Sequence, residues 1–189
     1  MGEKTSQTAG RAGLVAIWAL VGFLGALIVG WFVFPKLLYT RQEQPIRFSH
    51  AAHVSQGLEC QECHHLGADG RFSGLPPTET CAGCHGEVTG EDSPAGKEID
   101  RFVNTYLKTG KQVPWLVYQK QPDNVYFSHV AHKGFACSQC HPDMPGKKSP
   151  PPYFENRLTG YSKDTMKMWQ CERCHASMGV SNACYVCHK

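Results

Sequence analysis

The chain has no cysteine outside one repeated motif, and that absence narrows its class. All 10 cysteines among its 189 residues lie in Cys-x-x-Cys pairs, and a histidine follows each pair directly. A disulfide framework has no use for a histidine at a fixed place, and a structural zinc site does not require one after the second cysteine. Disulfides and structural zinc are therefore kept as alternatives that explain less of the pattern.

Aliphatic residues are scarce after residue 34, where glycine, proline and polar residues dominate. Such a chain buries a poor hydrophobic core unaided, so an apolar cofactor is expected to supply the missing mass. A large basic excess is also lacking, since the formal net charge is +3. We therefore expect no nucleic-acid partner.

The repeated motif, Cys-x-x-Cys-His, is the attachment site of c-type haem. Two thiols add to the vinyl groups of the porphyrin, and the adjacent histidine binds the iron as its proximal ligand. The motif occurs at Cys60, Cys63 and His64; Cys81, Cys84 and His85; Cys137, Cys140 and His141; Cys171, Cys174 and His175; and Cys184, Cys187 and His188. The sequence thus predicts five covalently bound haem c groups. We expect a haem-dominated fold of mainly short α-helices and coil with little sheet, plus one N-terminal transmembrane helix.

The segment from Gly13 to Phe34 carries no charged residue and is long enough to cross a bilayer as a helix. It is too long for the apolar part of a cleavable signal, and no small-x-small cleavage site follows, so we expect an uncleaved anchor. Covalent haem attachment occurs outside the cytoplasm in bacteria. The sequence therefore predicts a single-pass protein of the inner (cytoplasmic) membrane, with residues 1–12 in the cytoplasm and the haem domain on the periplasmic side.

The rest of the chain divides at changes in composition. A helix is predicted from Asp92, Ser93 and Pro94 to a stop at Gly110, because apolar residues recur there at helical spacing. The segment Val113 to Tyr118 reads as extended, and Lys147 to Asp164 as a proline-rich surface loop. The predicted divisions are an anchor at 13–34, a linker at 35–47, a first haem module at 48–85, a helix-containing spacer at 86–124 and a second haem module at 125–189.

Five histidines remain beyond the proximal ligands, and all lie in two similar phrases. These are FSHAAHVSQGLECQECHH, Phe48 to His65, and FSHVAHKGFACSQCH, Phe127 to His141. A low-spin haem iron needs a second axial ligand, which histidine or methionine supplies. The candidates number the same as the haems: His50, His53, His65, His129 and His132.

The two phrases resemble the cytochrome c3 and c7 families, in which Phe-x-His-x-x-His precedes a haem motif. The resemblance implies that the haem motifs beginning at Cys60, Cys81, Cys137 and Cys184 receive His50, His65, His129 and His132 respectively. The haem of Cys171 and Cys174 then has no clear partner. Met144 is favoured there over His53, and Met178 is a further candidate, because a thioether can also bind the iron.

The layout as a whole resembles the pentahaem subunit of alternative complex III. The shared features are one N-terminal span, two haem motifs, a spacer ending in VPWLVYQKQPDNVYFSHVAH, and three more motifs. The resemblance implies polytopic quinol-oxidising membrane subunits, an iron-sulfur protein and a monohaem cytochrome c as partners. It implies electron relay from the iron-sulfur partner towards a cytochrome c or oxidase. The span itself has no ionisable residue, so electrons from quinol would enter through a partner.

Two rival functions stay open. One is a stand-alone, membrane-anchored periplasmic quinol dehydrogenase of the multihaem type, which also has one N-terminal span. The other is a catalytic multihaem reductase, which needs an open iron position and often an altered proximal ligand. No Cys-x-x-Cys-Lys motif occurs. The sequence thus favours an electron-transfer subunit, without deciding whether the chain has an activity of its own.

Overall fold

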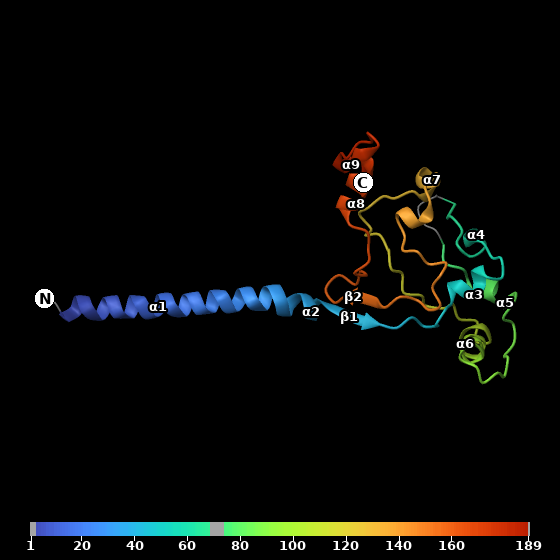
Figure 1. Ribbon diagram of the computed structural model, residues 1–189, viewed down its shortest axis with the longest axis horizontal. Helices are drawn as coiled ribbons and strands as arrows, with labels where there is room; N and C mark the ends of the chain where they lie inside the picture. The colour runs from blue at the N-terminus through green and yellow to red at the C-terminus, as the bar shows by residue number, and fades with distance from the viewer. Residues whose placement is uncertain (1–2, 69–73, 189) are drawn as a thin grey trace.

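A long helix extends from one end of the region that carries the haem motifs (Figure 1). The computed structural model describes residues 3–68 and 74–188, with side chains from residue 13 onward. Helix α1 runs from Glu3 to Ile28 and continues through a π-helical turn, Val29–Val33, into α2, Phe34–Leu38. Pro35 lies in the first turn of α2, where its missing N–H is tolerated, and the π-helical turn just before it relieves the backbone.

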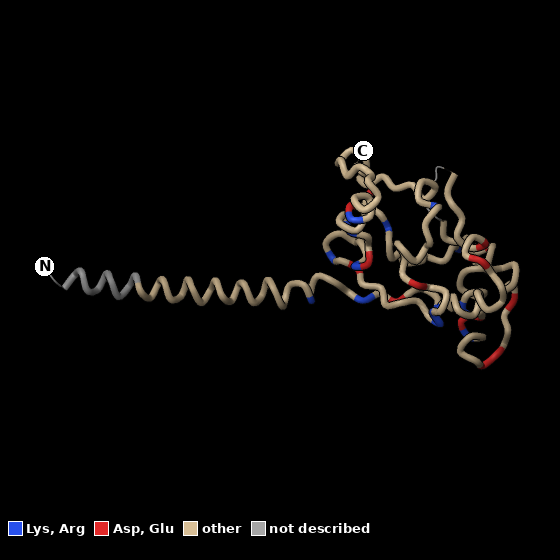
Figure 2. Tube along the Cα trace, turned by 45° about the horizontal axis from the view of Figure 1, so that its top comes forward, with Lys and Arg blue, Asp and Glu red and all other residues tan. Residues whose placement is uncertain are grey.

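The segment Gly13–Leu38 is long and apolar enough to cross a membrane, and none of it is buried within the protein. From residue 13 onward, Figure 2 shows charge on this helix only close to its C-terminal end, where the sequence has Lys36. The single membrane-spanning candidate agrees with the expected anchor, although the helix continues four residues beyond Phe34.

A two-stranded antiparallel sheet follows the helix directly. Strand β1, Tyr39–Gln42, pairs with β2, Tyr153–Asn156, so that Tyr39 lies opposite Asn156. The backbone N–H of Arg157 also donates to the carbonyl of Leu38 at 2.8 Å. The expectation that Lys147 to Asp164 is only a surface loop is therefore wrong. The strand escaped detection because it is four residues long and its partner is far away in sequence.

The spacer forms the main hydrophobic cluster. Helix α6, Pro94–Phe102, begins where the sequence predicted, and the Ser93 hydroxyl accepts the N–H of Gly96 at 3.0 Å. A π-helical turn, Val103–Leu107, extends it to Gly110, whose φ of +66° ends the helix. Val103 is fully buried beside Phe102, and Ile46 and Val113 complete the cluster. The predicted helix and its packing stripe are confirmed.

The extended segment from Val113 to Tyr118 is held by a side chain instead of a strand. The Gln44 amide donates to the carbonyl of Leu116 at 2.8 Å and accepts the N–H of the same residue at 3.0 Å. The Tyr118 hydroxyl donates to the carbonyl of Pro151, and its ring lies 5.4 Å from that of Tyr153. These contacts fasten the spacer to the segment that follows β1 and to the start of β2.

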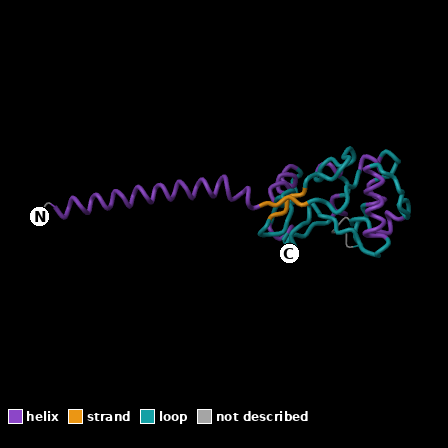
Figure 3. Tube along the Cα trace, turned by 90° about the horizontal axis from the view of Figure 1, so that it is seen from below, coloured by secondary structure: helices purple, strands orange, loops and turns teal. Residues whose placement is uncertain are grey.

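Short helices and coil make up the remainder, as Figure 3 shows. The haem motifs and the histidine phrases lie on or beside these elements. They are α3, His50–Val54; α4, Cys60–Cys63; α5, Thr78–Ala82; α7, His129–His132; a 3-10 turn, Cys137–Gln139; α8, Met168–Ser177; and α9, Cys184–Cys187. The predicted fold class, with mostly short helices and coil and a small sheet, is confirmed.

Candidate haem centres

Four pairs of histidine rings face each other across gaps of nearly one size. In each pair, one ring belongs to a haem motif and the other to one of the two histidine phrases. The ring centroids are 6.4 Å apart for His50 and His64, 6.0 Å for His53 and His85, 6.1 Å for His129 and His141, and 6.2 Å for His132 and His175. Two imidazoles on one iron have centroids about 6 Å apart, given metal–nitrogen bonds of about 2 Å and nitrogens about 1 Å from their centroids. Each pair therefore fits a haem iron between its rings.

One helical turn supplies two of the facing rings in each phrase. His50 and His53 lie three residues apart on α3, and His129 and His132 lie three apart on α7. Residues three apart share one side of a helix, so each turn directs its two rings to two neighbouring motifs. Each turn thus places one ring opposite the proximal histidine of each of two haem motifs.

A phenylalanine in each phrase fixes the angle between the two rings. Phe48 stacks on His53 at 4.3 Å and meets His50 edge-on at 4.8 Å. Phe127 repeats the arrangement, with His132 stacked at 4.6 Å and His129 edge-on at 4.8 Å. The sequence shows this phenylalanine in both phrases, but it does not show that the ring packs against both histidines. Counting candidate iron ligands requires only the histidines, so the phenylalanine was not predicted to be part of the site.

Backbone carbonyls orient four of the rings through Nδ1. The partners are Ser49 for His53 at 2.7 Å, Ser128 for His132 at 2.8 Å, Gly74 for His64 at 3.3 Å and Asn124 for His188 at 3.0 Å. A ring that donates its Nδ1–H in this way keeps the lone pair on Nε2. Nε2 is therefore the atom that these side chains present to an iron.

Burial keeps several of these rings in the form that binds metal. It lowers the pKa of His50, and the neighbouring His64 and His53 lower it further. Burial likewise lowers the pKa of His85, with a smaller effect from His53. A lowered pKa favours the neutral imidazole, which is the form that coordinates iron.

The observed pairing differs from the ligand assignment that the c3-like resemblance implies. That assignment gave His132 to the motif of Cys184, whereas the His132 ring faces His175. It gave His65 to the motif of Cys81, whereas His53 faces His85. The physical reason is the helical turn, which directs both of its rings to adjacent motifs whatever their separation in sequence.

At the fourth motif a second imidazole lies where the sequence favoured a methionine, since the His132 and His175 ring centroids are 6.2 Å apart. Met144 stays a prediction for the ligand of that haem, with His132 as its competitor. The Met178 sulfur lies instead 3.9 Å from the Cys174 sulfur, and the Met166 sulfur lies 3.6 Å from that of Cys171. These two thioethers contact the attachment cysteines.

Electrostatic coupling shows which motifs are neighbours in space. Burial raises the pKa of the Cys81 thiol, and Cys63 raises it further. Burial, followed by Cys174, raises the pKa of Cys140. In the same way burial and then Cys187 raise the pKa of Cys171. The first motif therefore lies near the second, the third near the fourth, and the fourth near the fifth.

One further coupling joins the two modules. Burial lowers the pKa of His141, and His129 and then His64 lower it further by repulsion between positive charges. His64 belongs to the first motif and His141 to the third. The two motifs that the spacer separates in sequence are therefore neighbours in the fold.

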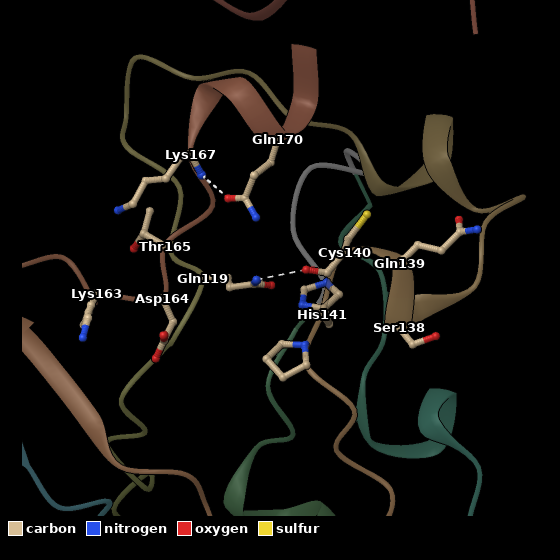
Figure 4. Close-up of a pocket in the computed structure, with 11 residues that line it drawn as sticks. Gln119, Ser138, Gln139, Cys140, His141, Lys163, Asp164, Thr165, Lys167 and Gln170 are labelled. Carbon is tan, nitrogen blue, oxygen red and sulfur yellow. Dashed lines mark hydrogen bonds between the residues drawn. The ribbon is translucent and has the colours of Figure 1, made fainter. Parts of the chain in front are cut away.

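An open hollow of about 380 Å³ borders the third motif (Figure 4). Cys140 and His141 line one side of it. Gln119 donates to the Cys140 carbonyl at 3.0 Å, and its buried Oε1 has no hydrogen-bond partner within the described residues. The buried Thr165 hydroxyl on the opposite side also has none within that part of the chain. A cofactor attached at this motif thus has open space beside it.

The cysteines themselves are available for attachment. All ten are free thiols. Within residues 3–68 and 74–188, no three or more His, Cys, Asp or Glu side chains are gathered closely enough to hold a metal ion by themselves. The facing imidazoles instead leave the width of a coordinated iron between two rings, and the haem alternative fits this geometry better than a zinc cluster does.

The chain belongs to the class III, multihaem cytochrome c family. The sequence model of that family matches residues 34–109. A relative from Nitratidesulfovibrio vulgaris (strain Hildenborough), described as "Menaquinone reductase, multiheme cytochrome c subunit", is 53% identical over 188 residues, covering 89% of this chain and 88% of that protein. The c3-like resemblance is therefore confirmed, and membership of the family makes covalently bound haem c the cofactor and electron transfer the general role.

Proposed function

We propose that this chain is a membrane-anchored pentahaem electron relay within a quinone-linked complex of the inner membrane. The observation that carries the proposal is the set of four facing imidazole pairs, built from two helical turns that each serve two motifs. Two imidazoles close both axial positions of an iron, which favours electron transfer over substrate chemistry. Ligands shared on one turn also hold neighbouring haems close together.

The couplings between motifs give the relay an order that differs from the sequence. The second motif adjoins the first through Cys81 and Cys63, and the first adjoins the third through His64 and His141. The third then leads to the fourth, and the fourth to the fifth. We propose a single line of haems in the order two, one, three, four, five.

In this order the line of haems runs from the distal end towards the end that carries the membrane helix. Helices α8 and α9 lie at the same end of the long axis as the strands that follow the anchor, although well to one side of them, whereas α5 and α6 lie at the far end (Figure 1). The fifth haem is therefore on the anchor side and the second haem on the distal side. We place the haem modules, 48–85 and 125–189, outside the cytoplasm, because covalent haem attachment occurs there in bacteria.

The relative supports electron flow towards menaquinone. Its name describes a menaquinone reductase subunit, whereas the likeness to alternative complex III suggests the reverse direction, from quinol. We propose quinone reduction for this chain, with polytopic membrane subunits, an iron-sulfur protein and a monohaem cytochrome c as the partners to look for. The apolar span offers no ionisable group for quinone protonation, so the quinone site is assigned to a partner.

The test is purification of the native protein in a mild detergent, with mass spectrometry of all co-purifying chains and a haem stain. The chemically reduced complex is then mixed with a menaquinone analogue, and haem oxidation is followed optically. We expect polytopic partners and rapid oxidation in the complex but slow oxidation in the isolated chain. A chain that purifies alone and oxidises quinol would establish the stand-alone dehydrogenase instead.

A further inference from the structure

One proximal histidine differs from the other four. His64, His85, His141 and His175 each face a second imidazole, whereas His188 faces none. All ten histidines lie in the described part of the chain, so this comparison covers every imidazole that the protein has. The fifth motif therefore lacks the second ring that each of the other four possesses.

His188 is nevertheless arranged as an iron ligand. Its Nδ1 lies 3.0 Å from the carbonyl of Asn124, which leaves Nε2 with the lone pair. The N–H of Tyr126 donates to the Cys187 carbonyl at 2.7 Å and fastens the motif to the segment before α7. The proximal side of this site is thus as well ordered by hydrogen bonds as those of the other motifs.

The remaining spare histidine does not reach it. His65 follows α4, and its ring lies against Gly74, where an added Cβ would come within 2.6 Å of Nε2. Along the long axis, α4 lies towards the far end of the haem-bearing part and α9 lies at the end that carries the anchor, with α7 between them (Figure 1). Five spare histidines match five haem motifs in number, but only four of them lie opposite a proximal histidine.

Two methionines beside α8 are engaged at the fourth motif. Met166 and Met178 contact the sulfur atoms of the fourth motif, at 3.6 Å and 3.9 Å. Tyr185 within the fifth motif is 74% exposed, and Val180, which precedes the motif, is 43% exposed. Within the described residues, His188 makes a hydrogen bond to the Asn124 carbonyl and no ring contact with another side chain.

We infer that the haem attached at Cys184 and Cys187 is five-coordinate, and that its distal face is a binding site for a small neutral ligand such as carbon monoxide. This inference rests on the proposed haem content. It places the only exchangeable iron position at one end of the relay, on the side of the membrane anchor. The four haems before it keep two imidazoles each and stay closed to such ligands.

The experiment titrates the full-length, haem-loaded chain in detergent with carbon monoxide after reduction, and measures high-spin iron by electron paramagnetic resonance in the oxidised state. Mass spectrometry first establishes the number of haems per chain. We expect one carbon monoxide and one high-spin haem per chain.

A chain that ends at Asn182 should lose one haem and all carbon monoxide binding. His132→Ala should raise binding to two and calibrates the measurement.

His65→Ala is the matched control and should leave the binding at one carbon monoxide per chain. Absence of binding in a protein with five haems would overturn the inference. In that case, binding gained in His65→Ala or Met178→Ala would identify the side chain that closes the site. Fewer than five haems by mass would instead refute the proposed haem content. If the shortened chain does not fold, the wild-type stoichiometry and the His65 variant still decide the question.

Discussion

The two histidine phrases have nearly the same local geometry, although the haem motifs packed against them differ. Phe48 and Phe127 each stack on the second histidine, at 4.3 Å and 4.6 Å, and meet the first edge-on at 4.8 Å. The second histidines nevertheless lie opposite rings of motifs at different distances along the chain, His85 in one case and His175 in the other. The helical turn and its phenylalanine thus set the positions of the two histidine rings. The rest of the fold brings a motif from elsewhere in the chain next to the second ring.

The phrases also differ in the orientation of one ring pair. His132 and His175 are nearly parallel, at 15°, whereas His53 and His85 meet at 72°. Both arrangements let two Nε2 atoms point at one iron, because rotation about the metal–nitrogen bond does not move the nitrogen. The same turn therefore tolerates different approaches of its distal motif, and electron paramagnetic resonance should distinguish the two haems.

Removing the second histidine of either phrase should have the largest effect. His53→Ala and His132→Ala should each convert one low-spin haem to high spin, because each removes one of two imidazoles from an iron. Optical and electron paramagnetic resonance spectra measure the change. Met144→Ala is the control and should leave the spectrum unchanged. A high-spin haem in Met144→Ala, together with an unchanged His132→Ala, would restore methionine as the ligand of the fourth haem.

Removing the phenylalanine should have an intermediate effect of similar size in both phrases. The substitutions are Phe48→Ala and Phe127→Ala. Each substitution removes half-buried apolar area and the ring contacts to two histidines, and Phe48→Ala also removes an edge-on contact with Trp115. We therefore expect unfolding free energies lower by about 1–3 kcal/mol in both variants. Thermal unfolding followed through the haem absorption measures this. Phe48→Leu and Phe127→Leu keep the apolar volume and should recover about half of the loss. If the two alanine variants lost very different amounts of unfolding free energy, the phenylalanine would contribute to stability in one phrase and not in the other.

The sequence predicts the local features well because they depend on short spacings. The haem motifs, the turns that carry His50 and His129, and the helix that starts at Ser93 all fall within a few residues. The partners His85 and His175 could not be predicted in this way, since they depend on how distant segments pack. Strand β2 was missed for the same reason, because four residues carry little pattern without their partner. Proximity between the first and third motifs is likewise a property of the fold alone.

The smallest predicted effect concerns the serine before each turn, where the two phrases differ most clearly. The Ser49 hydroxyl accepts the N–H of Ala52 at 3.1 Å and caps α3, whereas the Ser128 side chain makes no capping bond to α7. Ser49→Ala should therefore lower the unfolding free energy by about 1 kcal/mol, and Ser128→Ala should change it by only a few tenths. Thermal unfolding of both variants against wild type measures the difference.

The backbone carbonyls of both serines orient the second histidine, at 2.7 Å and 2.8 Å, and neither substitution removes a carbonyl. Both variants should therefore keep the wild-type number of low-spin haems, which separates a loss of helix stability from a loss of ligand orientation. Equal destabilisation by the two substitutions would show that the serine acts in some other way than as a helix cap. A high-spin haem in Ser49→Ala alone would show instead that the cap holds the ligands of the first module in place.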